Sequence, residues 1–125
     1  MTDITTISLR NNQFEGTIPT ILGKLDDIQT LNLDHNNLSG TVPTELGLCF
    51  RLSALHLHEN SFTGAIPSQL GDLPVLSNLR LEGNSFSGVE MPPQICALRE
   101  DDLSILTSDC KKTNQVTCDC CTECH

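Results

Sequence analysis

The chain contains 125 residues, of which 16 are Asp or Glu and seven are Lys or Arg, so its formal net charge is −9. A surface this acidic repels nucleic acid and anionic membranes, which excludes both as expected partners. The sequence also has no apolar run long enough to span a bilayer. At this length we expect one small domain with a modest hydrophobic core.

Four consecutive segments repeat the same pattern with a period of 24 residues: 4–27, 28–51, 52–75 and 76–100. One apolar column runs through Ile7, Leu31, Leu55 and Leu79. Around each of these residues, apolar and polar side chains alternate, as they do in a half-buried β-strand. Because a short strand cannot bury its apolar face alone, the units are expected to stack and form one parallel sheet.

After each strand, the repeat continues with an Asn and then a core position. The Asn amides are predicted to satisfy buried backbone groups from one unit to the next; they are Asn12, Asn36, Asn60 and Asn84. The core positions are Phe14, Leu38, Phe62 and Phe86. Tight or left-handed bends are expected at Gly16, Gly40, Gly64 and Gly88. Single 3₁₀ turns are predicted after Pro19, Pro43 and Pro67, closed by Gly23, Gly47 and Gly71.

Seven cysteines in so short a chain indicate an oxidising compartment. Cys49 occupies a position that is Leu in the other units, so we expect a buried free thiol there. The other six are expected to form three disulfide bonds, whose connectivity the sequence leaves open: Cys96, Cys110, Cys118, Cys120, Cys121 and Cys124. Residues 100–125 are predicted to form a degenerate fifth repeat, with Asp109 in place of the repeated Asn, and an irregular disulfide-rich cap.

Two metal-binding alternatives arise in the cysteine-rich tail. Cys121 to His125 matches C-x-x-C-H, the c-type haem attachment motif, but a polar tail offers no apolar pocket for haem. The cysteines between Cys118 and Cys124, together with His125, provide enough ligands for zinc, although their spacing is crowded for a single ion. Disulfide bonds already account for these cysteines, and we therefore expect no metal and no cofactor.

The L-S-G-x-I/V-P element within a 24-residue unit resembles the plant-type class of leucine-rich repeats, which is familiar from receptor-kinase ectodomains and polygalacturonase-inhibiting proteins. The resemblance implies an α/β leucine-rich-repeat solenoid of about four and a half repeats, with four of them in residues 1–99. It implies a right-handed arc with a concave parallel β-sheet, a short second sheet, and 3₁₀ turns on the convex side. The tail V-T-C-D-C-C-T-E-C-H resembles the C-terminal cysteine cap of algal leucine-rich-repeat proteins.

Polar side chains of successive strands are expected to form two columns on the concave face, because adjacent strands lie about 4.8 Å apart. The columns are Ser8, Asn32, His56, Arg80 and Arg10, Asp34, His58, Glu82. His58 is expected between two carboxylates and near Glu59, which predicts a raised histidine pKa and binding that is sensitive to mildly acidic pH. The candidate ligand-binding residues are Arg10, Asn32, Asp34, His35, His56, His58, Arg80 and Glu82.

The same cluster contains ligand types that suit a divalent metal. A specific ligand site is favoured over a metal, because the sequence reveals no second shell that would orient the imidazoles. A plain solvated polar face is the simplest interpretation of these columns.

These features predict an extracellular recognition module that binds a protein, peptide or glycan on its concave or flanking surface, in a receptor-like or inhibitor-like protein. The alternative is a structural or adhesion solenoid that binds polysaccharide or ice, as some plant-type relatives do. Ice binding favours a regular Thr or Asn array, whereas the concave columns are mixed. We expect no enzymatic activity, because the sequence contains no P-loop, G-x-S-x-G, H-E-x-x-H or dinucleotide-binding motif.

The first strand is expected directly after Met1-Thr2-Asp3, without a signal peptide or the cysteine-bearing cap of plant-type relatives. We therefore expect the chain to be the C-terminal part of a longer secreted or cell-surface protein, with further repeats or domains before it. Asn37-Leu38-Ser39 is the only N-glycosylation sequon. With Leu38 in the core, Asn37 is expected to face solvent and to accept a glycan.

Overall fold

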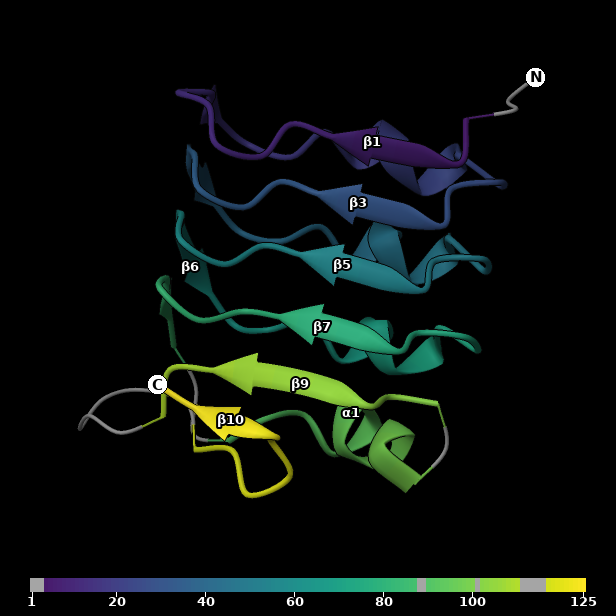
Figure 1. The fold of residues 1–125 in the computed structure, drawn as a ribbon, viewed down its shortest axis with the longest axis vertical. Helices are drawn as coiled ribbons and strands as arrows, with labels where there is room; N and C mark the ends of the chain where they lie inside the picture. Colours follow the sequence, from purple (N-terminus) through teal and green to yellow (C-terminus); the bar gives the residue numbers. More distant parts are fainter. Residues whose placement is uncertain (1–3, 88–89, 101, 111–116) are drawn as a thin grey trace.

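The computed structural model describes residues 4–87, 90–100, 102–110 and 117–125, so Gly88 lies outside the described residues. Two parallel sheets run along a solenoid (Figure 1). The larger sheet contains, in spatial order, β1 (Thr6–Ser8), β3 (Thr30–Asn32), β5 (Ala54–His56), β7 (Asn78–Arg80), β9 (Ile105–Ser108) and β10 (Glu123–Cys124). The smaller sheet contains β2 (Glu15–Gly16), β4 (Asn37–Gly40), β6 (Ser61–Gly64) and β8 (Ser85–Phe86).

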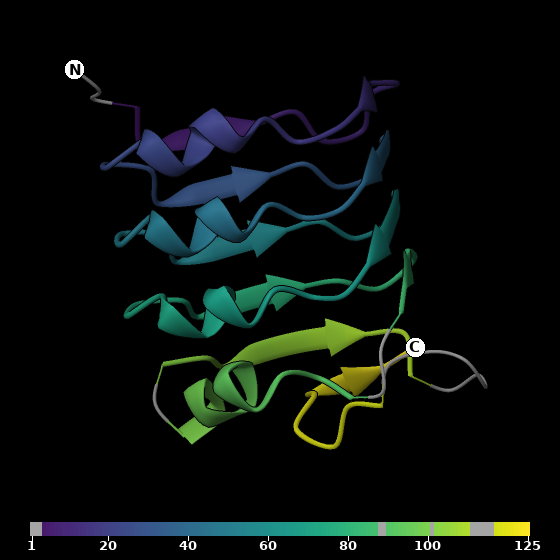
Figure 2. The same cartoon turned by 180° about the vertical axis from the view of Figure 1, so that it is seen from behind.

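Short helices cover the back of the larger sheet, as Figure 2 shows. They are η1 (Thr20–Lys24), η2 (Thr44–Leu48), η3 (Ser68–Asp72), α1 (Pro93–Ala97) and η4 (Leu98–Glu100). The parallel sheet and the 3₁₀ turns predicted from the repeat are confirmed, and the fourth unit differs by forming the α-helix α1 before η4. None of the helices described has the length and apolar character that crossing a membrane requires.

Strand pairing keeps the 24-residue register between coils. Leu31 lies opposite Leu55, and Leu55 lies opposite Leu79; none of the three is more than 1% exposed. The neighbouring side chains alternate to the other side of the sheet, away from the helices. We call this solvent side the concave face; its two columns are Ser8, Asn32, His56, Arg80 and Arg10, Asp34, His58, Glu82.

Asn side chains connect each coil to its neighbours. The Asn60 amide nitrogen donates to the Leu57 carbonyl of its own coil at 3.2 Å and to the Leu33 carbonyl of the previous coil at 2.9 Å. Its oxygen accepts a hydrogen bond from the Leu38 amide at 3.0 Å. Equivalent bonds are made by Asn36 and Asn84. The predicted Asn ladder is therefore confirmed between these coils, and it satisfies backbone groups that the turn removes from water.

The first coil is less buried than the sequence predicts. Phe14 was expected in the core, but it is 47% exposed, whereas Leu38, Phe62 and Phe86 at the equivalent positions are buried. The prediction is wrong for Phe14 because no coil formed by the described residues packs on its outer side. Phe14 and Ile7 help to line an apolar cavity of about 270 Å³ between the first two coils.

The glycines of the helical turns have a different role from the one predicted. Gly23, Gly47 and Gly71 lie inside the 3₁₀ helices and do not close them in a left-handed conformation. A Cβ atom added to Gly47 would lie 2.6 Å from the carbonyl oxygen of Gln69 in the next helix. The glycines are therefore required because consecutive helices pack in direct backbone contact.

The C-terminal segment completes the sheet. The tail was predicted to be irregular, but it contributes strand β10, which pairs in parallel with β9. Disulfide bonds join Cys96 to Cys120, Cys110 to Cys124 and Cys118 to Cys121. Arg99 donates hydrogen bonds to the carbonyl oxygens of Cys120 and Ser104. The Asp109 side chain accepts one from the backbone N–H of Asn84. The last coil is thus covered by a covalently fixed strand.

Replacing Asn60 by Ala should lower the free energy of unfolding by about 2 kcal/mol, because buried backbone groups of two coils lose their partners. The matched control is Asn12→Ala at the same repeat position. Asn12 is exposed, and among the described residues its side chain bonds only to carbonyl oxygens of its own coil, so loss of this side chain should cost less than about 0.5 kcal/mol. Urea unfolding followed by circular dichroism measures both values, and equal losses would contradict the role of the ladder.

Cys49 is buried, and its thiol is free. Burial raises the pKa of this thiol, and the negative charge of Asp26 raises it further. Iodoacetamide should therefore leave the native, oxidised protein unmodified near neutral pH, where the thiolate is scarce. After unfolding without a reductant, intact mass should show one alkylated cysteine. Modification of the native protein, or several adducts after unfolding, would overturn this assignment.

Candidate functional site

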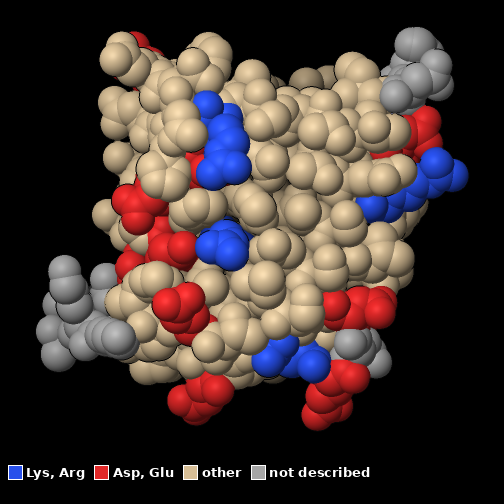
Figure 3. Space-filling model, viewed as in Figure 1, with Lys and Arg blue, Asp and Glu red and all other residues tan. Residues whose placement is uncertain are grey.

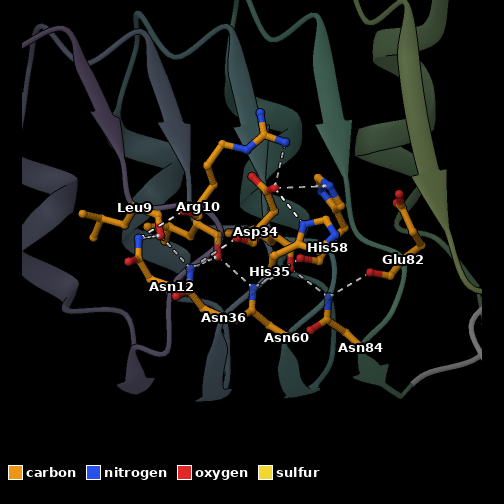
Figure 4. Close-up of polar contacts among 12 residues, drawn as sticks. Leu9, Arg10, Asn12, Asp34, His35, Asn36, His58, Asn60, Glu82 and Asn84 are labelled. Carbon is orange, nitrogen blue, oxygen red and sulfur yellow. Dashed lines mark hydrogen bonds and ion pairs between the residues drawn. The ribbon is translucent and has the colours of Figure 1, made fainter.

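Asp34 is the centre of a polar cluster on the concave face (Figure 4). It lies two residues beyond the end of β3, and Arg10 and His58 occupy the same position after β1 and β5. In-register pairing therefore places the three side chains in neighbouring coils. His35 follows in a left-handed conformation with a φ of 58°, which also occurs at Glu59 with a φ of 56°. This turn belongs to the repeat, and here it places the His35 ring beside the carboxylate.

The Asp34 carboxylate is completely buried by its neighbours. Its Oδ2 lies 3.0 Å from His35 Nδ1, 3.4 Å from Arg10 Nη2 and 3.6 Å from His58 Nε2, and its side chain is 0% exposed. Its Oδ1 is also buried and has no hydrogen-bond partner among the described residues. Since a buried carboxylate needs compensation by positive charge or hydrogen bonds, the surrounding cationic groups determine its state.

Two opposing effects set the pKa of Asp34. Burial raises the pKa of this carboxyl, but the hydrogen bond from His35, the positive charge that His58 carries when it is protonated, and the charge of Arg10 together outweigh burial. The pKa of Asp34 therefore lies below its ordinary value, and the group is a carboxylate at neutral pH.

The histidines respond in the direction opposite to the one predicted. Burial lowers the pKa of His58, and the carboxylates of Glu82 and Asp34 offset this effect only in part. Burial also lowers the pKa of His56, and the positive charge of His58 adds to the shift. The expectation of a raised His58 pKa was wrong, because it counted the nearby charges and not the loss of water around the ring. Neutral imidazoles are therefore favoured at neutral pH.

A row of incompletely paired polar groups lies beside this cluster. Asn32, His56 and Arg80 face one another across β3, β5 and β7. Asn32 Oδ1, His56 Nε2 and Arg80 Nε are buried and have no hydrogen-bond partner among the described residues. Asn78, which the sequence analysis did not select, adds a further buried oxygen to the same patch. The sequence does contain a sign of this role, because Asn78 is the one amide at the first strand position of the four repeats; the other units have Thr6, Thr30 and Ala54 there.

Glu82 occupies the side of the cluster nearest to the C-terminal cap. Its side chain is buried, and its Oε2 accepts a hydrogen bond from the Thr107 hydroxyl of β9. Thr107 was missed by the sequence analysis, because the concave columns were not extended into the degenerate fifth unit; in the structure, Thr107 pairs with Arg80. Figure 3, which looks onto the concave face, shows acidic and basic side chains close to one another and no large patch of one sign. The surface therefore suits a ligand with mixed polarity.

Among the described residues, one group of side chains brings together possible metal ligands. On the concave face, Asp34, His35 and His58 offer three ligand atoms that lie within 4.8 Å of one another. In the tail, by contrast, the six cysteines are paired in disulfide bonds. Paired sulfurs are not thiolate ligands, so zinc or haem binding by the tail loses its donors in this structure.

Residues 3–25, 27–49 and 51–73 match the family model described as Leucine Rich Repeat. A comparison with curated proteins finds no significant match. Solved structures do match. The BIR3–SERK2 complex from Arabidopsis thaliana contains a chain that is 33% identical, with a TM-score of 0.76. The match covers 94% of this chain and 62% of that one.

Two further structures bear on ligand type. The Arabidopsis receptor kinase HAESA, in complex with the peptide hormone IDA and the co-receptor SERK1, is 36% identical with a TM-score of 0.72, over 82% of this chain and 17% of that one. A plant ice-binding protein is 30% identical with a TM-score of 0.73, over 85% of this chain and 33% of that one. The chain spans less than two thirds of the length of each of these proteins.

Asn37 is exposed on β4, and the Leu38 side chain that follows it is buried. Expression through a eukaryotic secretory pathway should therefore add one N-linked glycan, because the sequon is accessible. Intact mass before and after enzymatic deglycosylation measures the addition. Ser39→Ala removes the sequon and should abolish the mass shift, whereas an unmodified wild-type protein would contradict the prediction.

Proposed function

Because this chain belongs to the leucine-rich-repeat family, we propose that it is an extracellular recognition module that binds a peptide segment of a partner on its concave face. The observation that carries the proposal is the row formed by Asn32, His56 and Arg80, whose buried polar atoms lack partners among the described residues. Leaving such atoms unpaired costs about 1–3 kcal/mol each. A ligand that shifts the side chains covering these atoms and pairs with them recovers this energy, which makes the row a suitable place for binding.

A peptide fits this row for a chemical reason. The side-chain Oδ1 of Asn32 accepts hydrogen bonds and the Arg80 Nε donates them, so the row presents an acceptor on β3 and a donor on β7, with β5 between them. A peptide backbone carries donors and acceptors in alternation. The peptide hormone bound to the similar HAESA ectodomain supports this ligand class. The disulfide-fixed cap supports an extracellular location.

Adhesion to ice is the competing function, because a plant ice-binding protein shares the fold at similar identity. We rank it second, since the two columns of the concave face contain a mixture of charged, amide and imidazole groups and no repeated Thr. Polysaccharide binding and a purely structural role rank below it, because no similar structure described above supports either. An ice-binding surface would give thermal hysteresis, and that activity would not depend on Arg80.

The test is a selection of phage-displayed random peptides on the immobilised, oxidised protein, followed by calorimetry with the synthetic peptide that is enriched most. Arg80→Gln should weaken binding by about tenfold or more, because the substitution removes a partly buried charged donor from the concave face. Circular dichroism and thermal melting check that the variant remains folded.

The matched control is Arg51→Gln. Arg51 lies between η2 and β5, is largely exposed, and pairs with Asp27 at 2.8 Å, so its loss should leave peptide affinity unchanged. Equal affinity for wild type and Arg80→Gln would overturn binding at this row. Failure to enrich any peptide, together with thermal hysteresis in the wild type, would favour ice adhesion.

A further inference from the structure

A three-ligand constellation lies next to the proposed peptide row. Asp34 and His58 come from adjacent coils at the same repeat position, and His35 comes from the left-handed turn after Asp34 (Figure 4). Their ligand atoms converge, because Asp34 Oδ2 lies between His35 Nδ1 at 3.0 Å and His58 Nε2 at 3.6 Å. The three side chains form a compact group of two imidazoles and one carboxylate.

These separations match the geometry of a zinc ion. Zinc binds imidazole nitrogen and carboxylate oxygen at about 2.0–2.2 Å in tetrahedral sites, so two of its ligand atoms are about 3.3 Å apart. The distances from Asp34 Oδ2 to the two imidazole nitrogens lie on either side of this value. The three ligand atoms all lie within 4.8 Å of one another, so an ion can enter when the two imidazoles close around it.

The environment of Asp34 provides a second, independent reason to expect a cation at this position. Its side chain is 0% exposed, and its Oδ1 lacks a hydrogen-bond partner among the described residues. The only fixed positive charge close to this carboxylate among the described residues is on Arg10, at 3.4 Å, and the Arg10 side chain is 51% exposed. Because about half of the Arg10 side chain is exposed to solvent, its charge is screened and compensates the buried carboxylate only in part. A divalent cation would compensate the buried charge more completely.

We propose that Asp34, His35 and His58 form a binding site for one divalent transition metal ion, with zinc as the ion that this donor set fits. Arg10 leaves the carboxylate when the ion binds, and the proton on His35 Nδ1 moves to Nε2 as that imidazole becomes a ligand. Three protein ligands leave a fourth position for water or for a group of a bound partner. That position opens toward solvent beside His35, whose side chain is 46% exposed.

The test uses the metal alone, so its result is independent of any peptide. Calorimetric titration of the oxidised protein with zinc chloride should show one site. His35→Gln should weaken zinc binding by at least about tenfold, as should His58→Gln, because each removes a ligand. Arg10→Gln should tighten binding by at least about twofold, because it removes a competing positive charge.

The matched control is His125→Gln, which changes a histidine outside the cluster that lies 3.7 Å from Glu123 and should leave zinc affinity unchanged. His35 is partly exposed, so its variant remains informative even where His58→Gln affects folding, and thermal melting verifies the fold of each. Absence of one-site binding would overturn the proposal. So would zinc binding that persists in His35→Gln and disappears in His125→Gln.

Discussion

In-register pairing of successive parallel strands is the constraint on which the structure depends. When Leu31, Leu55 and Leu79 stack in one column, every other repeat position must stack as well. A slip of one residue would turn each strand's apolar side chain toward solvent. The Asn side chains reinforce the same register, because the amide of Asn60 bonds to backbone atoms of its own coil and of the previous one. The concave columns are therefore a consequence of core packing, and their chemistry is free to vary.

The features that recur in every 24-residue unit could be predicted from the sequence. Those that depend on how neighbouring side chains bury one another could not. The strand column and the role of Asn60 follow from residue types that recur in every unit. The complete burial of Asp34 does not, because it results from the way His58 and two other side chains close over one carboxylate. For the same reason, a sequence shows the charges around His58 but not the water that its ring has lost.

At both ends of the solenoid the structure differs from the sequence-based prediction, and in both cases the cause lies in what packs against the end. Phe14 has the residue type of a core position, but no coil of the described residues lies on its outer side, so it is exposed in this structure. The tail strand that contains Cys124 has no repeat pattern, and only its pairing with β9 makes it part of the sheet. Sequence periodicity identifies the side chains with which each unit packs against its neighbours. Whether those side chains are buried in an end unit depends on which segment lies next to it.

The glycine of each convex helix also sets a rule for how such a chain can grow. At Gly71 an added Cβ would meet the Gln94 side chain and backbone of the next helix, so an interior unit tolerates only hydrogen there. Cys96 occupies the same place in the fourth unit, where the neighbour is the disulfide partner Cys120. A gene duplication that copied an interior unit would extend the solenoid. One that copied the fourth unit would insert a side chain between packed helices, so lengthening is restricted to the units that carry the glycine.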